Sequence, residues 1–294
     1  LIRIKIFFNI FYSINPKAYP KNNKSNVHKR NFFYEKIRYA YAWIKYKFFI
    51  AGLKKRKLVF IGSSSSMTKL NNKYFHRYFD SLIDYYELGS DSYIFYYDRV
   101  PENVFNNKIV FFLDNFIKEF KVLNSKNNVC NKKVELNGYD DFYKTVLKDE
   151  DYGYLKEFLL KENVIKWVNK IIANSLFFEE VYQKTQPQKV IYNGFSGVDD
   201  MWSSLYAANK LGIQTVDIQH GPISNFHMVF SNWTKVPQQG YNTMVKEFWT
   251  WEDMSNNSIK EWADTTSRVK SKITGNIFLS YIINRENKNI IDCF

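Results

Sequence analysis

The segment Gln219-His-Gly-Pro222 contains the residue best suited by type and position to do chemistry, His220. His220 directly follows residues 215–219, an apolar and β-branched run that predicts a strand. A neutral imidazole there can take a proton from an attacking hydroxyl, because the unperturbed pKa of histidine is about 6.5. Gly221 would let a substrate approach closely, and Gln219 would line the same site. The alternative is a structural histidine that only forms hydrogen bonds.

The loop Gly194-Phe-Ser-Gly-Val-Asp-Asp200 is the second group of residues that could touch a substrate. Its candidate binding residues are Gly194, Ser196 and Asp199. The acidic pair at its end has a second explanation, because carboxylates are favourable at the N-terminus of a helix. We therefore expect this loop to shape a binding site and to start a helix.

Gly62 and Ser63 begin a Gly-Ser-Ser-Ser-Ser run that could hold a phosphate with its backbone N–H groups. The run lacks the Lys-Ser/Thr ending of a P-loop, so an ordinary turn between strand and helix is the favoured alternative. His220 and His227 could suggest a metal, but no cysteine supports them and few acids are near. The sequence predicts no metal site and no cofactor.

These residues need a scaffold, and the pattern around them predicts one. A strand at 189–193, a helix at 201–211 and a strand at 215–219 form a βαβ unit, which implies a parallel sheet. Further strands are expected at 57–61 and 93–97, and helices at 74–86, 115–122 and much of 154–183. The predicted fold class is α/β, a Rossmann-like parallel sheet flanked by helices. Ligands of such sheets bind beyond the carboxyl ends of the strands, where the candidate residues would meet.

Charge is distributed very unevenly along the chain. Residues 1–57 contain 15 Lys or Arg and one acid, whereas the rest of the chain is nearly balanced, so the net charge of +13 belongs to the N-terminal arm. Within it, 31–53 predicts an amphipathic helix with an apolar stripe at Phe33, Ile37, Ala40, Tyr41, Ile44 and Phe48. This helix could lie on an anionic membrane surface or pack on the protein's own core. Nucleic acid is not an expected partner, because the globular part carries no basic excess.

Cysteine use and hydropathy bear on location. Cys130 and Cys293 are far apart, which fits a reducing compartment, and no apolar run approaches the roughly 20 residues of a membrane span. The apolar start of the chain lacks a cleavage pattern for a signal peptide. We expect a cytoplasmic protein that is peripheral at the inner face of the cell membrane.

A longer set of residues resembles a known family. The similarity is to capsule and O-antigen glycosyltransferases of the GT-B type, and it is carried by Gln214-Thr-Val-Asp-Ile-Gln-His-Gly-Pro-Ile223, Trp233, Gly240-Tyr241, Phe248-Trp-Thr-Trp251 and Ile273-Thr-Gly-Asn276. The His-Gly step is also similar to one in teichoic-acid glycerophosphotransferases. Pro222-Ile-Ser-Asn225 stands here where those enzymes commonly have Thr-Pro-Leu-Lys, which argues against a phosphoglycerol donor.

The resemblance implies two Rossmann-like domains that face a cleft, one for the acceptor and one for the donor. It implies transfer of a sugar from a nucleotide sugar to a lipid-linked saccharide, with His220 as base or orienting group and no obligatory metal. The expected organisation is a basic arm at 1–56, an acceptor-side domain at 57–222, and at 223–294 a crossing segment that opens a truncated donor domain. Only 18 residues follow Asn276. A non-catalytic binding subunit and a sugar-nucleotide epimerase of the same build are the alternatives.

Overall fold

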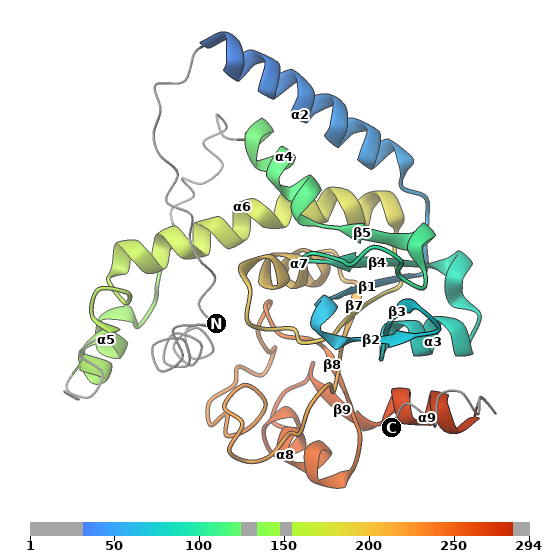
Figure 1. The fold of residues 1–294 in the computed structure, drawn as a ribbon. Helices are drawn as coiled ribbons and strands as arrows, with labels where there is room; N and C mark the ends of the chain where they lie inside the picture. The colour runs from blue at the N-terminus through green and yellow to red at the C-terminus, as the bar shows by residue number, and fades with distance from the viewer. Residues whose placement is uncertain (1–31, 125–133, 148–154, 285–294) are drawn as a thin grey trace.

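The computed structural model describes residues 32–124, 134–147 and 155–284. Within these ranges the chain forms one large parallel sheet with helices on both faces, and a small two-stranded sheet beside it (Figure 1). The start of the predicted basic arm, 1–31, lies outside the described residues. Residues 125–133, 148–154 and 285–294 also lie outside them.

The large sheet has seven strands in the order β5-β4-β1-β6-β7-β8-β9, and every neighbouring pair is parallel. The strands are β1 (Leu58–Gly62), β4 (Ser92–Tyr96), β5 (Val110–Phe112), β6 (Lys189–Tyr192), β7 (Gln214–Ile218), β8 (Glu247–Thr250) and β9 (Lys270–Ile273). Counted in chain order within the sheet, this is 3-2-1-4-5-6-7, the Rossmann arrangement with one strand added. The predicted fold class and the three strands expected near residues 58, 190 and 216 are confirmed.

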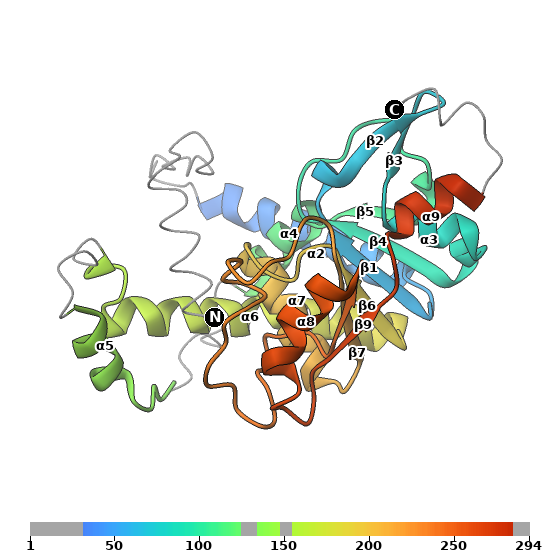
Figure 2. The ribbon, with the colours of Figure 1, turned by 90° about the horizontal axis from the view of Figure 1, so that it is seen from below.

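Helices cover the sheet on two sides. The described helices are α2 (Phe32–Gly52), α3 (Phe79–Tyr85), α4 (Asp114–Asn124), α5 (Tyr139–Leu147), α6 (Lys161–Thr185), α7 (Asp199–Lys210), α8 (Asp253–Ala263) and α9 (Ile277–Asn284). One layer contains α2, α4, α6 and α7, which contact one another in series, while α3 and α9 pair on the opposite side (Figures 1 and 2). The helix α8 packs along β9.

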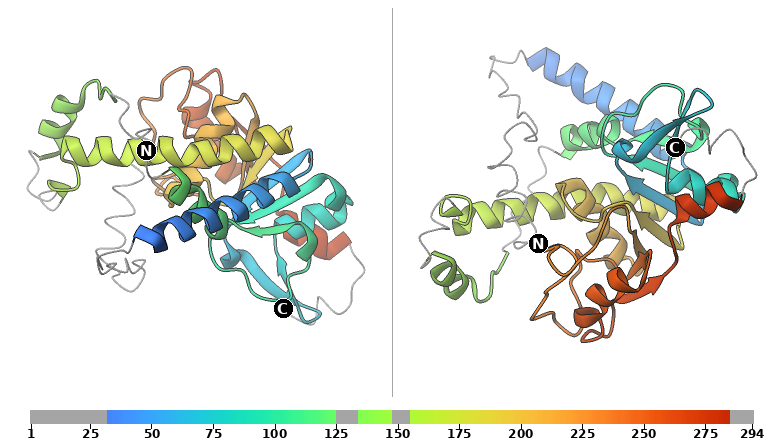
Figure 3. Two further views of the ribbon diagram at one scale, coloured as in Figure 1. Left: turned by 90° about the horizontal axis from the view of Figure 1, so that it is seen from above. Right: turned by 60° about the horizontal axis from the view of Figure 1, so that its bottom comes forward.

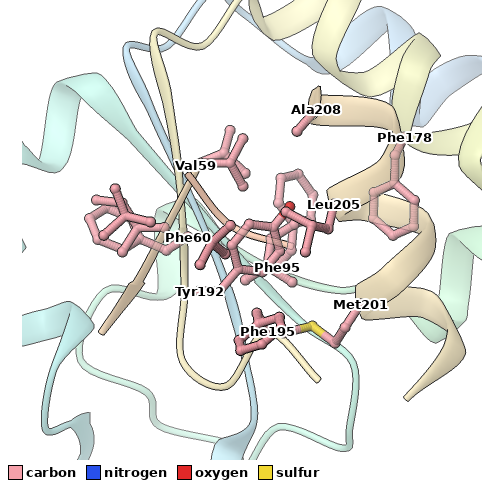
Figure 4. Packing of buried hydrophobic residues seen from close by; sticks show 14 of the residues in the cluster. Val59, Phe60, Phe95, Phe178, Tyr192, Phe195, Met201, Leu205 and Ala208 are labelled. Atoms are coloured by element: carbon pink, nitrogen blue, oxygen red, sulfur yellow. The ribbon is translucent and has the colours of Figure 1, made fainter. Parts of the chain in front are cut away.

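Alternation along β1 explains how both layers are held. Val59 and Phe60 are fully buried and point to opposite faces of the strand (Figure 4). Val59 faces Leu205 and Ala208 of α7, whereas the ring of Phe60 lies 5.1 Å from that of Phe79 in α3. Strands buried on both faces read as continuous apolar runs, which is why this part of the fold is visible in the sequence.

The predicted helix at 74–86 is wrong in its first half. Residues Met67–Leu70 (β2) and Lys73–His76 (β3) form an antiparallel hairpin, and α3 begins only at Phe79. The two turn residues, Asn71 and Asn72, both have positive φ angles, of 49° and 60°. That geometry belongs to a type I′ turn, whose twist matches the twist of the two strands. The hairpin projects beyond the end of β1 (Figure 2).

The predicted boundary at residue 222 does not separate two sheets in the structure. Both β8 and β9 extend the same sheet, with Val216 aligned with Glu247 and Glu247 with Lys270. After β9 the chain returns to the first half of the fold, where Tyr281 of α9 donates a hydrogen bond of 2.7 Å to Asp84. The described residues after 222 therefore complete the Rossmann sheet.

The predicted boundary at residue 56 also cuts through a packed unit. Tyr46, Phe49 and Leu53 of α2 belong to the main hydrophobic core. The Tyr46 hydroxyl donates to Glu180 of α6 at 2.8 Å, and Lys45 pairs with Glu119 of α4 at 3.0 Å. The described part of the predicted arm, α2, thus packs on the α/β domain.

Candidate functional site at the carboxyl edge of the sheet

The ends of β1, β4, β6 and β7 meet at one edge, and the direction of winding reverses between β1 and β6. In open α/β sheets this reversal leaves a crevice, because the connections leave the two strands toward opposite faces. The segments that leave the edge here are the serine run after β1, the 194–200 loop after β6, and the Gln219-His-Gly run after β7. The topology therefore brings the predicted site segments together.

His220 is exposed at this edge and is fixed from one side. Its Nδ1 lies 3.3 Å from the carbonyl oxygen of Ile218, a distance at which Nδ1–H donates a hydrogen bond. The hydroxyl of Tyr78 donates to the backbone carbonyl of His220 at 3.1 Å, which ties the start of α3 to this loop. With Nδ1 protonated, the neutral ring has its lone pair on Nε2.

Gly194 lies directly against this imidazole. A Cβ atom at residue 194 would stand 3.3 Å from Cε1 and 3.5 Å from Nε2 of His220, and the backbone has a φ of +82°. Both the tight contact and the left-handed backbone favour glycine. The predicted loop glycine thus sets the position of the predicted base.

Electrostatics keeps His220 neutral at physiological pH. Desolvation by the surrounding protein lowers the pKa of His220, although the residue as a whole is exposed. The carbonyl of Ile218 acts in the opposite direction, and the positive charges of His227 and Arg77 lower the pKa further. A neutral ring with a free Nε2 lone pair can accept a proton.

A second imidazole, His76 of β3, lies behind the first and was not predicted from the sequence. It is fully buried and stacks on Phe79, with the ring centroids 4.0 Å apart. Its Nδ1 accepts a hydrogen bond from the backbone N–H of Phe79 at 3.1 Å, so the proton of the neutral ring is on Nε2. Burial is the main cause that lowers the pKa of His76 to about 3; the backbone of Ser63 opposes the shift, and the charges of Arg77 and His220 add to it.

The serine run after β1 is closed by a carboxylate. Asp98, just beyond β4, accepts from the Ser63 hydroxyl at 2.6 Å and from the Ser64 N–H at 2.7 Å. A phosphate at this turn would need the same donors and would meet a negative charge. Gly62 is required for packing, because a Cβ there would lie 2.8 Å from the ring of Phe79. The turn is therefore closed by its own hydrogen bonds, which disfavours the phosphate site considered for Gly62 and Ser63.

Gln219 is buried and links β7 to its neighbours. Its Oε1 accepts from the Trp251 N–H at 2.7 Å, and its Nε2 donates to the Gly221 carbonyl and to Ser255 Oγ, each at 3.0 Å. All the polar atoms of this side chain have protein partners, so Gln219 holds the loop that contains His220 in place. A Cβ at Gly221 would meet nothing within 4 Å, which leaves the position after His220 open.

The acidic residues of the 194–200 loop face α6. Asp199 accepts from the Trp167 indole at 2.9 Å and pairs with Lys170 at 2.7 Å. Ser196 lies half-buried in the same loop. The loop is held from below by Asp217 of β7, whose buried carboxylate accepts from the Gly194 N–H at 2.9 Å. Burial raises the pKa of Asp217 well above its usual range, although the loop N–H groups of Gly194 and Phe195 oppose the shift.

Three residues of this site have signals that sequence reasoning missed. His76 could have been found from the Asn71-Asn72 pair, because two residues that adopt positive φ between short strand-like runs indicate a hairpin. Asp98 and Asp217 are weaker signals. Asp98 follows the end of β4, and Asp217 interrupts the apolar strand β7. His227 lies in the loop after β7 and influences the charge of His220.

The strand order and this edge define the chain as a Rossmann-like α/β protein with its polar groups collected at the switch point. A scan against models of known protein families finds no match, and no curated protein is significantly similar to the chain. Within the described ranges, no group of three or more His, Cys, Asp or Glu side chains could hold a metal ion.

Proposed function

We propose that the chain binds a lipid-linked saccharide acceptor at the carboxyl edge of its sheet and acts in the transfer of a sugar from a nucleotide-sugar donor. The resemblance carried by residues between Gln214 and Asn276 motivates the reaction class. The Asp98 carboxylate disfavours a phosphate at the serine run, because it already accepts the hydrogen bonds of Ser63 and Ser64 and carries a negative charge.

The observation that carries the proposal is the state of His220. Its Nδ1 is tethered to the Ile218 carbonyl, its ring is neutral, and its Nε2 lies beside Gly194 at an open edge. In the proposed step an acceptor hydroxyl gives its proton to Nε2 while its oxygen bonds to the anomeric carbon of the donor. The bond from that carbon to the nucleotide phosphate breaks, and the phosphate leaves with the electron pair. The imidazolium then returns its proton to solvent.

The test follows His220 directly by NMR of the ¹³C-labelled ring in the intact chain. Short-chain analogues of bacterial lipid-linked oligosaccharides are titrated first, and nucleotide sugars second. We expect saccharide binding to move the His220 Cε1 signal far more than that of the buried His76. A panel in which only nucleotides move the His220 signal contradicts the acceptor-side assignment.

Turnover gives the second measurement, with donor and acceptor both supplied. His220→Gln keeps a polar side chain but removes the base, so we expect transfer to fall by about 10²-fold or more. His227 is an unsuitable control because it influences His220, so the matched variant is Lys260→Ala on the exposed side of α8. Equal losses in both variants would exclude His220 as the base.

A further inference from the structure

The helix α2 has two apolar faces, and only one of them is used inside the protein. Ala42, Tyr46, Phe49 and Leu53 are between 0% and 7% exposed and pack on α4 and α6. The opposite face carries Ile37, Tyr41, Ile44 and Phe48, which are 52%, 60%, 49% and 76% exposed. These four residues, here called the outer stripe, follow the i, i+4, i+7, i+11 spacing of one helix face.

The sequence predicts this apolar stripe and leaves two interpretations of it, contact with a membrane surface or packing on the protein's own core. Packing on the protein's own core is excluded for it, because that role belongs to the face with Tyr46 and Phe49. In Figures 1 and 3, α2 is the outermost helix of its layer, on the far side of α4 from the sheet. A rigid, anchored helix thus presents a continuous apolar row outward.

Cations border the outer stripe on both sides. At 100° per residue, Lys36 and Lys47 lie along one border and Arg38 and Lys45 along the other. The single acid of α2, Glu35, lies on the face opposite the outer stripe. The exposed Lys54 and Lys55 follow directly after the helix.

We propose that the outer stripe of α2 docks into the headgroup layer of an anionic membrane, with α2 parallel to the surface. The apolar row would enter the boundary of the acyl chains, while Arg38 and Lys47 reach the lipid phosphates and Lys45 keeps its pair with Glu119. Among the described residues no helix is long and apolar enough to cross a bilayer, so this contact would be peripheral. The proposal does not depend on the chemistry assigned to His220.

Charge favours the membrane over the other possible occupants. A second copy of the chain would bring two cationic borders together, which Coulomb repulsion disfavours. RNA would use the cations but would leave Ile44 and Phe48 in water. An anionic bilayer satisfies both the apolar and the cationic residues of this one face.

The experiment is flotation of the full chain with phosphatidylcholine vesicles, with and without one third phosphatidylglycerol. We expect binding to the anionic vesicles, and we expect it to weaken at high salt. Ile44→Ser with Phe48→Ser should lower the vesicle partition coefficient at least about tenfold, because the apolar residues that enter the layer are lost. Arg38→Gln with Lys47→Gln should lower it by a similar factor, since each cation near the surface contributes about 1 kcal/mol.

The chain offers a matched control in α9. Leu279 and Ile283 are one helical turn apart and are 53% and 68% exposed, but this helix contains no cation. Leu279→Ser with Ile283→Ser should leave vesicle binding unchanged. Binding that survives both α2 double variants would overturn the proposal. So would a lipid-free dimer that the Ile44 and Phe48 variant converts to monomer, because the stripe would then be covered by a second copy.

Discussion

At the scale of single residues, the site depends on one close contact between a glycine and a histidine. Gly194 lets the imidazole of His220 lie against the loop after β6, and the Ile218 carbonyl fixes the other side of the ring. The sequence identified both residues as candidates but not their contact, because residues on neighbouring strand ends have no fixed spacing in the chain. The βαβ pattern predicts that the two residues lie at neighbouring strand ends, but only the folded structure shows that they are in contact.

Gly194→Ala tests this contact against a matched glycine. Gly194 and Gly212 have nearly the same φ, +82° and +75°, but a Cβ at Gly212 would meet nothing within 4 Å. Each alanine variant should therefore lose about 1–2 kcal/mol of unfolding free energy from the left-handed backbone. Only Gly194→Ala should also shift the His220 ring signals in a ¹H–¹³C spectrum. A shift of equal size in Gly212→Ala would show that His220 senses general loosening and not the contact.

His76 makes the stability of the fold depend on pH. Its folded pKa of about 3 lies below its ordinary value of 6.5, so protons bind more tightly to the unfolded chain. The contribution is present above about pH 6.5 and is lost as the pH falls toward 3. Between about pH 7 and about pH 5 the loss should be about 2 kcal/mol. His76→Asn keeps an acceptor for the Phe79 N–H but cannot titrate.

The measurement is urea unfolding of the wild type and His76→Asn at both pH values. Asp80 and Asp217 also have raised pKa values, mainly because of burial, and they change stability in the opposite direction. Since they are present in both proteins, the difference between the two proteins isolates His76. A difference that is the same at both pH values would mean that His76 binds protons equally in the folded and unfolded states.

At the scale of elements, the sequence predicts strands and helices that have a clear apolar pattern. It does not predict the hairpin, which depends on the conformation of its turn residues. The strands β1, β6 and β7 were predicted because buried parallel strands are apolar throughout. The predicted helix at 74–86 includes most of β3, because Tyr74, Phe75 and Tyr78 fit a helical spacing as well as an extended one. The strands β8 and β9 were assigned to a second domain by resemblance, and only strand pairing shows them in the first sheet.

Asn72 provides the test of the hairpin. Asparagine tolerates its φ of +60°, and glycine tolerates it better, whereas alanine does not. Asn72→Ala should lower the unfolding free energy by about 1 kcal/mol, while Asn72→Gly should preserve or raise it. Chemical denaturation of the three proteins is sufficient. Equal losses for alanine and glycine would mean that the asparagine side chain, and not the backbone angle, stabilises the turn.

At the scale of the whole molecule, one core unites segments that the sequence assigned to different parts. Residues of α2, of the central strands and of α8 belong to the same buried cluster, and α9 returns to α3. The charge boundary near residue 57 therefore does not coincide with a break in the packing of the described residues. Removal of α2 as a detachable arm would expose the core between α4 and α6. Substitutions within α2 therefore test its two faces better than deletion does.

Two adjacent phenylalanines of α2 separate the roles of its faces. Phe49 is buried and its ring stacks on Phe116, with the centroids 3.8 Å apart, whereas Phe48 is 76% exposed. Phe49→Ala should lower the unfolding free energy of the whole domain by about 3–5 kcal/mol, because it leaves a cavity in the shared core. Phe48→Ala should change it by less than about 0.5 kcal/mol. Urea unfolding, followed by tryptophan fluorescence and by circular dichroism, should give one coincident transition for both variants. If Phe49→Ala left the transition of the sheet unchanged, α2 would be a separate unit and the charge boundary would be a true domain boundary.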